Sequence, residues 1–511
     1  MLRDAQNHVS RPIHRVPMIT ETITPPPTTR TPSMIGYLTQ LAAGPIVFAL
    51  VMSAPVALPY AGHVTLATFA WAAAWWIAEP LPWAVAAMLP FLVFPAAGVM
   101  DIVATMRLYG QPIFFWIMGT VLMGYAIEKH GLAHRFTIAF LALPGLGGKT
   151  TRLTFAYMLI VGLISVFVSD AATIAMTIPI GMAIVRHTRP QGERKQFAAF
   201  MTLATLYAAV AGGTATIVGV PHNAIVMAAL QRLTGQQIGF FEWMKIGVPI
   251  FIAFLLIFYA VLWLMLPPEV REVPSGEAFI RAERAKLGPL RPNQRRVLFV
   301  FAMMVVLFTL PAVAGLAVGD RAPATIWLNR ALNVWVIPPA VMFLLFVVRS
   351  ADDPSTGLLT WKDAEQQSPW NAMLLVTGAV AMTDALSQFG FVEFMGNIVR
   401  TLGITPTALP YVAAWSTAVT TNFMSGTATA ALFCNFFIPA AVQIGYNPAS
   451  IAILIANVAL GMVVPWAGAT AVTTYTAGEI EIKQMVRVGI VVTAVYTTIA
   501  ATIHLMMAAI I

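Results

Sequence analysis

The chain has 511 residues, of which 59% are hydrophobic and only 10% are charged, and its net charge is +8. Soluble domains carry about 25% charged residues, so this composition excludes an ordinary soluble fold and predicts an all-α polytopic membrane protein. The basic residues gather in loops such as 186–195 and 271–296, a pattern typical of positive-inside topology and not of a nucleic-acid-binding face.

The first half of the chain consists mostly of apolar segments, and two of these segments are interrupted by polar residues or by glycine and proline. Residues 1–40 are polar and rich in Pro and Thr, and we expect a disordered cytoplasmic tail there, without the hydrophobic region of a signal peptide. Because a membrane-spanning helix needs about 20 apolar residues, the first repeat, 41–266, is expected to place its plain spans at 41–58, 62–79, 83–100, 112–130 and 245–266. Polar residues break the segment 153–186, and glycine and proline interrupt the helix expected at 197–230.

The second half repeats this order after a charged cytoplasmic linker, 267–296. Plain spans in the second repeat, 297–511, are expected at 297–318, 332–349, 370–389 and 485–510. A broken segment occupies 405–443 and an interrupted helix occupies 449–477. We therefore predict about 11 transmembrane helices plus two re-entrant helical hairpins, with the amino terminus in the cytoplasm.

The two broken segments also match each other in sequence. FVSDAATIA at 167–175 and FMSGTATAA at 423–431 share Phe, Ser, Ala, Thr and Ala at the same steps, with an offset of 256. The helices before them share Gly119 with Gly378 and Gly131 with Gly390. Inverted repeats with broken helices are typical of secondary transporters, whose site lies at the repeat interface near the midplane.

The polar tips of the hairpins are the candidate site. A carboxylate such as Asp170 is costly in hydrocarbon without a partner or water. Ser169 and Ser425 lie where half-helices would begin, and the free N–H groups and dipole of a helix start favour an anion. Loop carbonyls would instead bind sodium, a hard cation that takes oxygen ligands. Tight helix packing explains any single Gly, Ser or Thr as well, but two matched pairs of hairpin and interrupted helix favour a site.

Several motifs resemble those of the divalent anion:sodium symporter family, which carries dicarboxylates, citrate or sulfate. They are WWIAEPLPWAVAAMLP (75–90), EKHGLAHR (128–135), both hairpin tips and GVPHN (219–223). The resemblance extends over roughly residues 60–511. It implies a homodimer in the plasma membrane, expected to be a bacterial inner membrane, and an elevator-type mechanism with a rigid scaffold and a moving transport domain.

The resemblance also implies positions for the ligands. Substrate is expected at Ser169, Asp170, Ser425, Gly426, Thr427, Gly468 and Ala469. A first sodium site would use Ser165, Ser169, Asp170 and the Gly219 carbonyl, and a second would keep only Thr421 and backbone groups such as that of Gly426.

The chain departs from the family pattern at both tips. Asp170 and Gly426 stand where the family has Asn, and His222 replaces a Pro. A negative Asp170 repels a nearby dianion unless it is neutralised, so sodium or a proton could be the coupling ion. A third possibility is a substrate less anionic than a dicarboxylate. His222 could titrate or serve packing alone. Asp384 could be a second proton site, or it could face the bundle interior or an interface.

We therefore predict a secondary active transporter of a small anion, with a sodium-coupled di- or tricarboxylate as the leading candidate. A proton-coupled or exchange carrier that uses Asp170 stays open, as does a membrane-embedded enzyme or channel on the same scaffold. The sequence has no phosphate-binding loop, zinc-ligand spacing or hydrolase elbow, so we predict no enzyme. The expected partners are the anion, the lipid bilayer and a second copy of the chain, with no organic cofactor and no nucleic acid.

Overall fold

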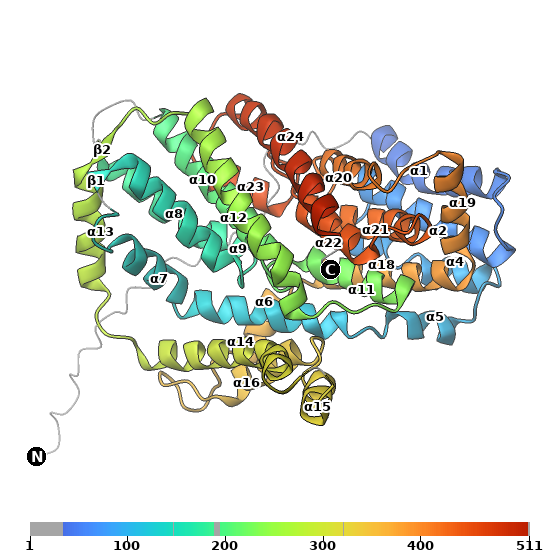
Figure 1. Cartoon of the computed structure of the whole chain (residues 1–511), viewed down its shortest axis with the longest axis horizontal. Helices are drawn as coiled ribbons and strands as arrows, with labels where there is room; N and C mark the ends of the chain where they lie inside the picture. The colour runs from blue at the N-terminus through green and yellow to red at the C-terminus, as the bar shows by residue number, and fades with distance from the viewer. Residues whose placement is uncertain (1–33, 147, 189–194, 320, 509–511) are drawn as a thin grey trace, which may run out of the picture.

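The computed structural model describes residues 34–146, 148–188, 195–319 and 321–508, and it is built almost entirely of helices (Figure 1). One small sheet is described, in which β1 (Gly148–Lys149) pairs antiparallel with β2 (Glu272–Val273). The all-α polytopic fold is thereby confirmed. Most of the predicted tail, 1–40, lies outside the described residues, and its last part, 34–40, begins the helix α1 (Met34–Ser53).

The remaining helices follow the predicted order of segments. In the first half they are α2 (Tyr60–Ala78), α3 (Trp83–Ala86), α4 (Pro90–Ala96), α5 (Ile102–Tyr109), α6 (Ile113–Lys129), α7 (Leu132–Leu141), α8 (Thr150–Ser165), α9 (Asp170–Thr188), α10 (Lys195–Thr214), α11 (Pro221–Thr234) and α12 (Phe240–Met265). In the linker and second half they are α13 (Pro274–Lys286), α14 (Pro292–Val318), α15 (Pro323–Ala331), α16 (Ile337–Val347), α17 (Trp361–Gln367), α18 (Trp370–Gln388), α19 (Phe391–Thr401), α20 (Leu409–Thr420), α21 (Gly426–Gln443), α22 (Pro448–Val458), α23 (Ala469–Ala477) and α24 (Ile482–Met507).

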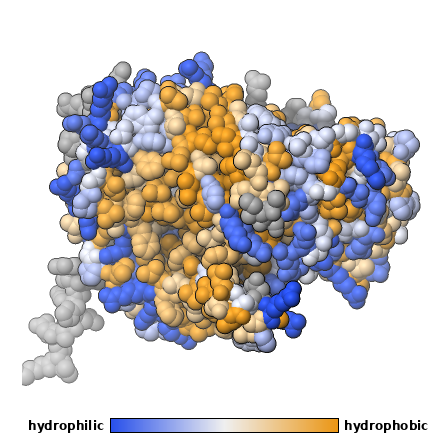
Figure 2. Space-filling model, viewed as in Figure 1, coloured by the Kyte–Doolittle hydropathy of each residue, from blue (hydrophilic) through white to orange (hydrophobic). Residues whose placement is uncertain are grey.

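Seven helical spans among the described residues, one of which joins α5 to α6, are long and apolar enough to cross a membrane. The number is eight if the pair α18 and α19, bent by 79°, counts as one span. The sequence predicts about 11, and the difference arises because several apolar segments are divided into shorter helices. The segment expected at 83–100, for example, forms α3 and α4. Figure 2 shows hydrophobic residues over the middle of one face and hydrophilic residues toward its left and right ends, as a bilayer-embedded protein requires.

Matched glycines of the two halves make matched contacts. A Cβ at Gly119 of α6 would lie 2.3 Å from the Pro338 carbonyl oxygen of α16, and one at Gly378 of α18 would lie 2.4 Å from the Ala87 carbonyl oxygen that follows α3. Each glycine thus touches a segment from the other half of the chain. Such reciprocal contacts between matched positions are expected if a pseudo-two-fold axis relates the two halves.

A second matched pair begins the short helices α7 and α19. Gly131 precedes α7 with φ 71°, and Gly390 precedes α19 with φ 83°. Both angles fall in the left-handed region that favours glycine. Figure 1 places α7 toward the left end of the long axis and α19 toward the right end. Equivalent turns at opposite ends of the molecule support an inverted relation of the two halves.

We expect Gly119→Ala and Gly378→Ala each to destabilise the protein by about 1 to 3 kcal/mol, because the new methyl group would overlap a backbone carbonyl that cannot move cheaply. Thermal unfolding of the purified protein in detergent measures the change. Gly110→Ala is the control, since its Cβ meets nothing closer than 3.4 Å and its φ is −71°. Equal melting temperatures for all three variants would contradict the close packing of these helices.

Candidate functional site

The first tip joins α8 to α9 and holds a buried carboxylate. The Ser165 hydroxyl, at the end of α8, donates to Asp170 Oδ1 over 2.8 Å. Asp170, the first residue of α9, is only 4% exposed. Among the described residues no basic side chain forms an ion pair with it. A carboxylate this buried with one neutral partner calls for a cation or a proton.

The break between α10 and α11 packs directly on this tip. A Cβ at Gly213 would lie 2.5 Å from Asp170 Oδ1, so the carboxylate rests against the α10 backbone. The Thr216 hydroxyl donates to the Val166 carbonyl over 2.6 Å. Asn223 Nδ2 donates to the carbonyls of Gly213 and Thr216 over 2.9 and 2.8 Å. These bonds hold the break in one shape and fix it to the first tip.

The sequence predicts four sodium ligands around this tip. Of the predicted ligands, Ser165 and Asp170 are in direct contact. The Cβ position of Gly219 lies 2.5 Å from the Gly213 carbonyl oxygen, and the Cβ position of Gly213 lies 2.5 Å from Asp170 Oδ1. Ser169 contributes its carbonyl to the first turn of α9, where it accepts from Thr173 N over 2.9 Å.

One further oxygen near this tip has no partner. Asn223 Oδ1 is buried and, within the described part of the chain, accepts no hydrogen bond. The sequence analysis did not single out Asn223, whose signal is an amide in an apolar segment. Because its Nδ2 holds Gly213, which touches Asp170, the amide oxygen is an additional candidate cation ligand.

The second tip, between α20 and α21, carries no charge. Ser425 caps α21, and its hydroxyl accepts from Ala428 N over 3.2 Å. A Cβ at Gly426 would lie 2.3 Å from the Ala459 carbonyl oxygen, so the packing leaves no room for a side chain there. The Thr421 hydroxyl donates to the Thr417 carbonyl over 2.7 Å. The side chains of Thr421 and Gly426 therefore offer a second cation neither a carboxylate nor a side-chain amide, which leaves backbone groups and the Thr421 hydroxyl.

Asn422, which the sequence analysis also missed, joins this tip to the break between α22 and α23. Its Oδ1 accepts from Val463 N over 2.9 Å, and its Nδ2 donates to the Ala418 carbonyl over 2.8 Å. Gly461, in the same break, has a Cβ position 3.1 Å from the Thr421 carbonyl oxygen. Each hairpin tip is thus bound to the interrupted helix of its own half.

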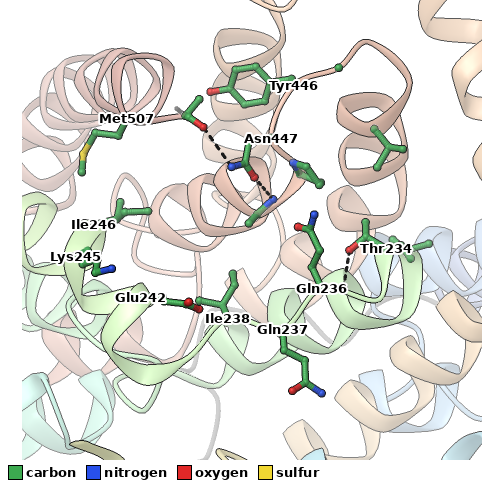
Figure 3. A pocket seen from close by; sticks show the side chains of 16 residues that line it. Thr234, Gln236, Gln237, Ile238, Glu242, Lys245, Ile246, Tyr446, Asn447 and Met507 are labelled. Atoms are coloured by element: carbon green, nitrogen blue, oxygen red, sulfur yellow. Dashed lines mark hydrogen bonds between the residues drawn. The ribbon is translucent and has the colours of Figure 1, made fainter. Parts of the chain in front are cut away.

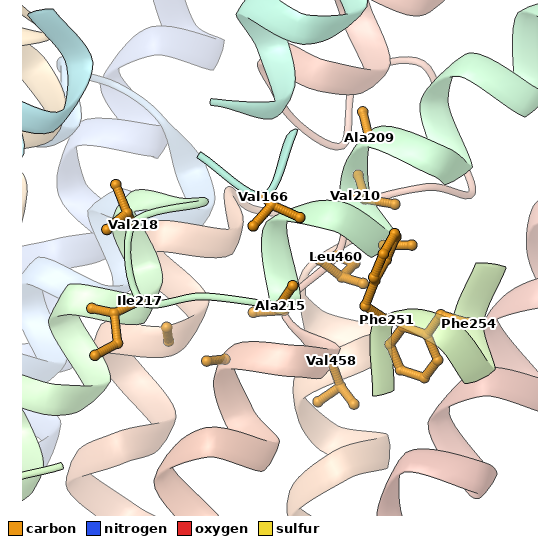
Figure 4. Close-up of a cluster of buried hydrophobic side chains, with 14 of the residues drawn as sticks. Val166, Ala209, Val210, Ala215, Ile217, Val218, Phe251, Phe254, Val458 and Leu460 are labelled. Atoms are coloured by element: carbon orange, nitrogen blue, oxygen red, sulfur yellow. The ribbon is translucent and has the colours of Figure 1, made fainter. Parts of the chain in front are cut away.

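The break between α10 and α11 also reaches the second tip. His222, in the first turn of α11, places Nδ1 3.5 Å from the Cβ position of Gly426. One short segment therefore touches Asp170 at its Gly213 end and Gly426 at its His222 end. Figure 4 shows the apolar surroundings. One buried cluster includes Val166 of the first tip, three residues of this break and two residues near the end of α22; the last five are Ala215, Ile217, Val218, Val458 and Leu460.

The half-helices that follow the breaks pack on the opposite hairpins. The helix α11 lies on α21 of the second hairpin, and α23 lies on α9 of the first. Gly468 precedes α23, and open space surrounds its Cβ position, while Ala469 is exposed. Among the described residues the side chains of Ser169 and Thr427 form no hydrogen bond. These predicted substrate positions are available to a ligand.

A cavity of about 1060 Å³ lies elsewhere (Figure 3). Its polar lining includes Thr234, Gln236, Glu242, Lys245 and Asn447. Thr234 ends α11, a helix of 14 residues that begins beside His222, so this cavity lies roughly 20 Å from the hairpin tips. It is separate from the candidate anion site.

Known proteins resemble this chain over most of its length. The sodium-dependent dicarboxylate transporter SdcS of Staphylococcus saprophyticus is 27% identical over 480 residues, which cover 89% of this chain and 88% of that protein. The SdcS protein of Staphylococcus aureus strain bovine RF122 / ET3-1 is 26% identical over 488 residues, which cover 90% and 88%. The crystal structure of the Alcanivorax borkumensis YdaH transporter matches the fold with a TM-score of 0.51 and 13% identity, over 76% of this chain and 84% of that one.

The family described as the sodium:sulfate symporter transmembrane region matches residues 32–511. That match confirms the resemblance to divalent anion:sodium symporters and places the chain among multi-pass membrane transporters, not enzymes. The chain belongs to this sodium:sulfate symporter family.

Proposed function

We propose that this protein carries a small anion, with a di- or tricarboxylate as the leading candidate, across a bacterial plasma membrane together with sodium. The observation that carries the proposal is the buried carboxylate of Asp170, which begins a helix and has, among the residues that the structure describes, only the Ser165 hydroxyl as a hydrogen-bond partner. Relatives named as sodium-dependent dicarboxylate transporters support the choice of ion and anion.

The geometry supports coupling through charge. Helix starts at Asp170 and Gly426 offer free N–H groups and the positive end of the helix dipole to an anion. A bare Asp170 carboxylate would repel that anion across a poorly solvated gap. A sodium ion on Asp170 and Ser165 removes the repulsion, so each ligand strengthens binding of the other. The empty carrier, the carrier with sodium alone and the loaded carrier then differ in charge, which couples the two fluxes.

An elevator-type movement is part of the proposal. The helix α11 carries His222 of the site at one end and Arg232 at the other. Arg232 Nη1 lies 3.6 Å from Asp384 Oδ2 of α18, and Arg232 Nη2 donates to Gln111 Oε1, before α6, over 2.5 Å. If α11 moves with the site while α6 and α18 stay in the scaffold, this polar contact must break during transport. Asp384 then acts at an interface and not as a second proton site.

Two finer statements rest on the family resemblance. We expect a homodimer, which the mass of the purified protein in detergent tests. We also expect the amino terminus, β1 and α13 to lie in the cytoplasm, since the linker around α13 is rich in Arg. Labelling of cysteines introduced on either side of the membrane tests the orientation.

Asp170→Asn should preserve sodium-driven uptake but raise the sodium concentration for half-maximal uptake by roughly tenfold, because a charged ligand is replaced by a neutral one. Uptake of radiolabelled succinate into proteoliposomes at graded sodium concentrations measures this. Asp353→Asn, at an exposed loop residue, is the control.

A pH gradient that drives uptake in the absence of sodium would instead support the proton-coupled or exchange carrier. In that case Asp170→Asn should lose accumulation but retain exchange. If the sodium and pH dependence of uptake is unchanged in both Asp170→Asn and Asp170→Ala, Asp170 only begins a helix and does not bind the coupling ion.

Ser425→Ala and Thr427→Ala should each weaken anion binding by about 1 kcal/mol, because each removes a hydroxyl beside the helix start of α21. The measurement is the half-saturation for succinate at saturating sodium. Thr427→Ser keeps the hydroxyl and is the matched control. A melting curve separates loss of the Ser425 cap from loss of binding. If both alanine variants have the wild-type half-saturation for succinate, Ser425 and Thr427 do not contact the anion.

Asp384→Asn should change the maximal uptake rate by roughly fivefold while the sodium and succinate half-saturations stay constant, because a partly exposed ion pair contributes about 1 kcal/mol to one conformation only. The charge-exchanged variant Arg232→Asp/Asp384→Arg should recover the rate, and Glu393→Gln, exposed on α19, is the control. If Asp384→Asn leaves the rate unaltered, the contact does not distinguish conformations of the carrier.

A further inference from the structure

A groove of about 500 Å³ runs between α7, α8 and α14 and reaches the first tip. Its walls include Phe136 of α7, Leu163 of α8 and Phe301 of α14, and every side chain that lines it is apolar. Phe136 and Leu163 are 39% and 44% exposed, so the groove is open to the surroundings of the protein. Contact with lipid requires apolar side chains but not a hollow between three helices, so this shape suits one bound chain.

One end of the groove lies at the first tip. Phe167 and Val168 line it there, directly before Ser169 and Asp170. The rings of Phe167 and Phe301 meet edge to face, with their centroids 5.1 Å apart. The groove therefore ends where α14 touches the first hairpin.

Two arginines lie toward the start of α14 and the end of α7. Arg295 precedes the groove residue Leu298 by three positions, so the two share one face of α14. Arg284 Nη1 donates to the Ala142 carbonyl, next to the groove residue Leu143, over 3.2 Å. Both arginines are exposed, and among the described residues neither forms an ion pair with an acidic side chain.

Arg135 of α7 attaches the turn between α13 and α14 to this wall of the groove. Its Nη1 donates to the Leu287 carbonyl over 3.0 Å and to Gln294 Oε1 over 3.4 Å. Leu287 follows Arg284 by three residues, and Gln294 directly precedes Arg295. In Figure 1, α7, α13 and the start of α14 all lie toward the left end of the molecule. Positive charge without an acidic partner thus gathers on one side of an apolar groove.

This combination of features matches an anionic phospholipid. Lipid tails are as apolar as leucine, so the groove alone gives no preference among lipids. A guanidinium group binds phosphate oxygens through two parallel hydrogen bonds, so the arginines supply the preference. A free phosphate has the charge but no chain, and a zwitterionic lipid has the chain but no net charge. The anionic lipids of a plasma membrane are concentrated in the cytoplasmic leaflet, the side on which we expect α13.

We propose that this groove binds an acyl chain of an anionic phospholipid whose phosphate lies at Arg295 and Arg284. The inference goes beyond the proposed function, because it assigns a second ligand to a surface apart from the sodium and anion positions. If α8 moves against α14 during transport, the bound chain lies at the moving boundary.

Photo-crosslinking of the purified full-length protein in detergent tests this proposal. The probe is phosphatidylglycerol with a diazirine near the end of one acyl chain, and mass spectrometry identifies the labelled peptides. We expect label in residues 160–168 and 298–301. Phosphatidylcholine with the same chain should label them about fivefold less or weaker still, because each Arg near a membrane surface favours an anionic lipid by about fivefold.

Arg295→Gln should lower the phosphatidylglycerol label in the groove by about fivefold, because it removes one phosphate partner. Arg330→Gln, at an exposed residue of α15, is the control. Leu163→Trp fills the groove and should abolish the label, whereas Leu264→Trp, at a residue of α12 that is 82% exposed, should keep it. Melting curves identify any variant that does not fold.

Equal labelling by the two lipids would overturn the inference, and so would full labelling of Arg295→Gln. Label spread evenly over other exposed apolar helices such as α12 would mean that the lipid has no site in the groove. These outcomes leave the proposed function intact, because the measurement needs no sodium, anion or transport.

Discussion

Backbone polar groups that lose their helical partners inside an apolar protein must find new ones, and the site depends on how they do so. Four helices end and four begin at the two breaks and two tips, and free N–H and C=O groups in such surroundings are costly. Side chains satisfy some of them. Thr216 and Asn223 bind carbonyls around the first tip, and Asn422 binds an N–H of the second break. These short bonds fix loops that would otherwise be free to rearrange.

Once the loops are fixed, the polar atoms that still lack a hydrogen-bond partner have defined positions. Asp170 keeps one neutral partner, and Asn223 Oδ1 and His222 Nε2 keep none among the described residues. All three lie on or against the segment from Gly213 to Asn223. A rigid segment with a few unpaired polar atoms is a preorganised binding site, because the protein does not need to reorder itself when the ligand arrives. The apolar cluster in Figure 4 lies in the same region, and charges in apolar surroundings interact more strongly than they would in water.

The sequence could predict the helices, the breaks and the tips, because each is a local pattern of apolar runs interrupted by Gly, Pro and Ser. The Ser165–Asp170 contact was also within reach, since both residues flank one tip. Sequence patterns could not show that His222 lies beside Gly426, because 204 residues separate them and only the packing of α11 on α21 joins them. Nor could they assign Asp384 to Arg232, a contact that depends on how α11 crosses α18.

The difference between the two tips follows from charge. If both tips carried a carboxylate, two negative groups would face one anion, and more cations would be needed to neutralise them. If neither did, the site would hold the anion by helix ends alone and would bind sodium weakly. Under the proposed function, one carboxylate at Asp170 and a glycine at 426 would concentrate the cation at one end of the α10–α11 break and leave the other end to the ring of His222. In this proposal, two halves with matched sequence motifs would bind two different ligands, because single side chains make the halves chemically unequal.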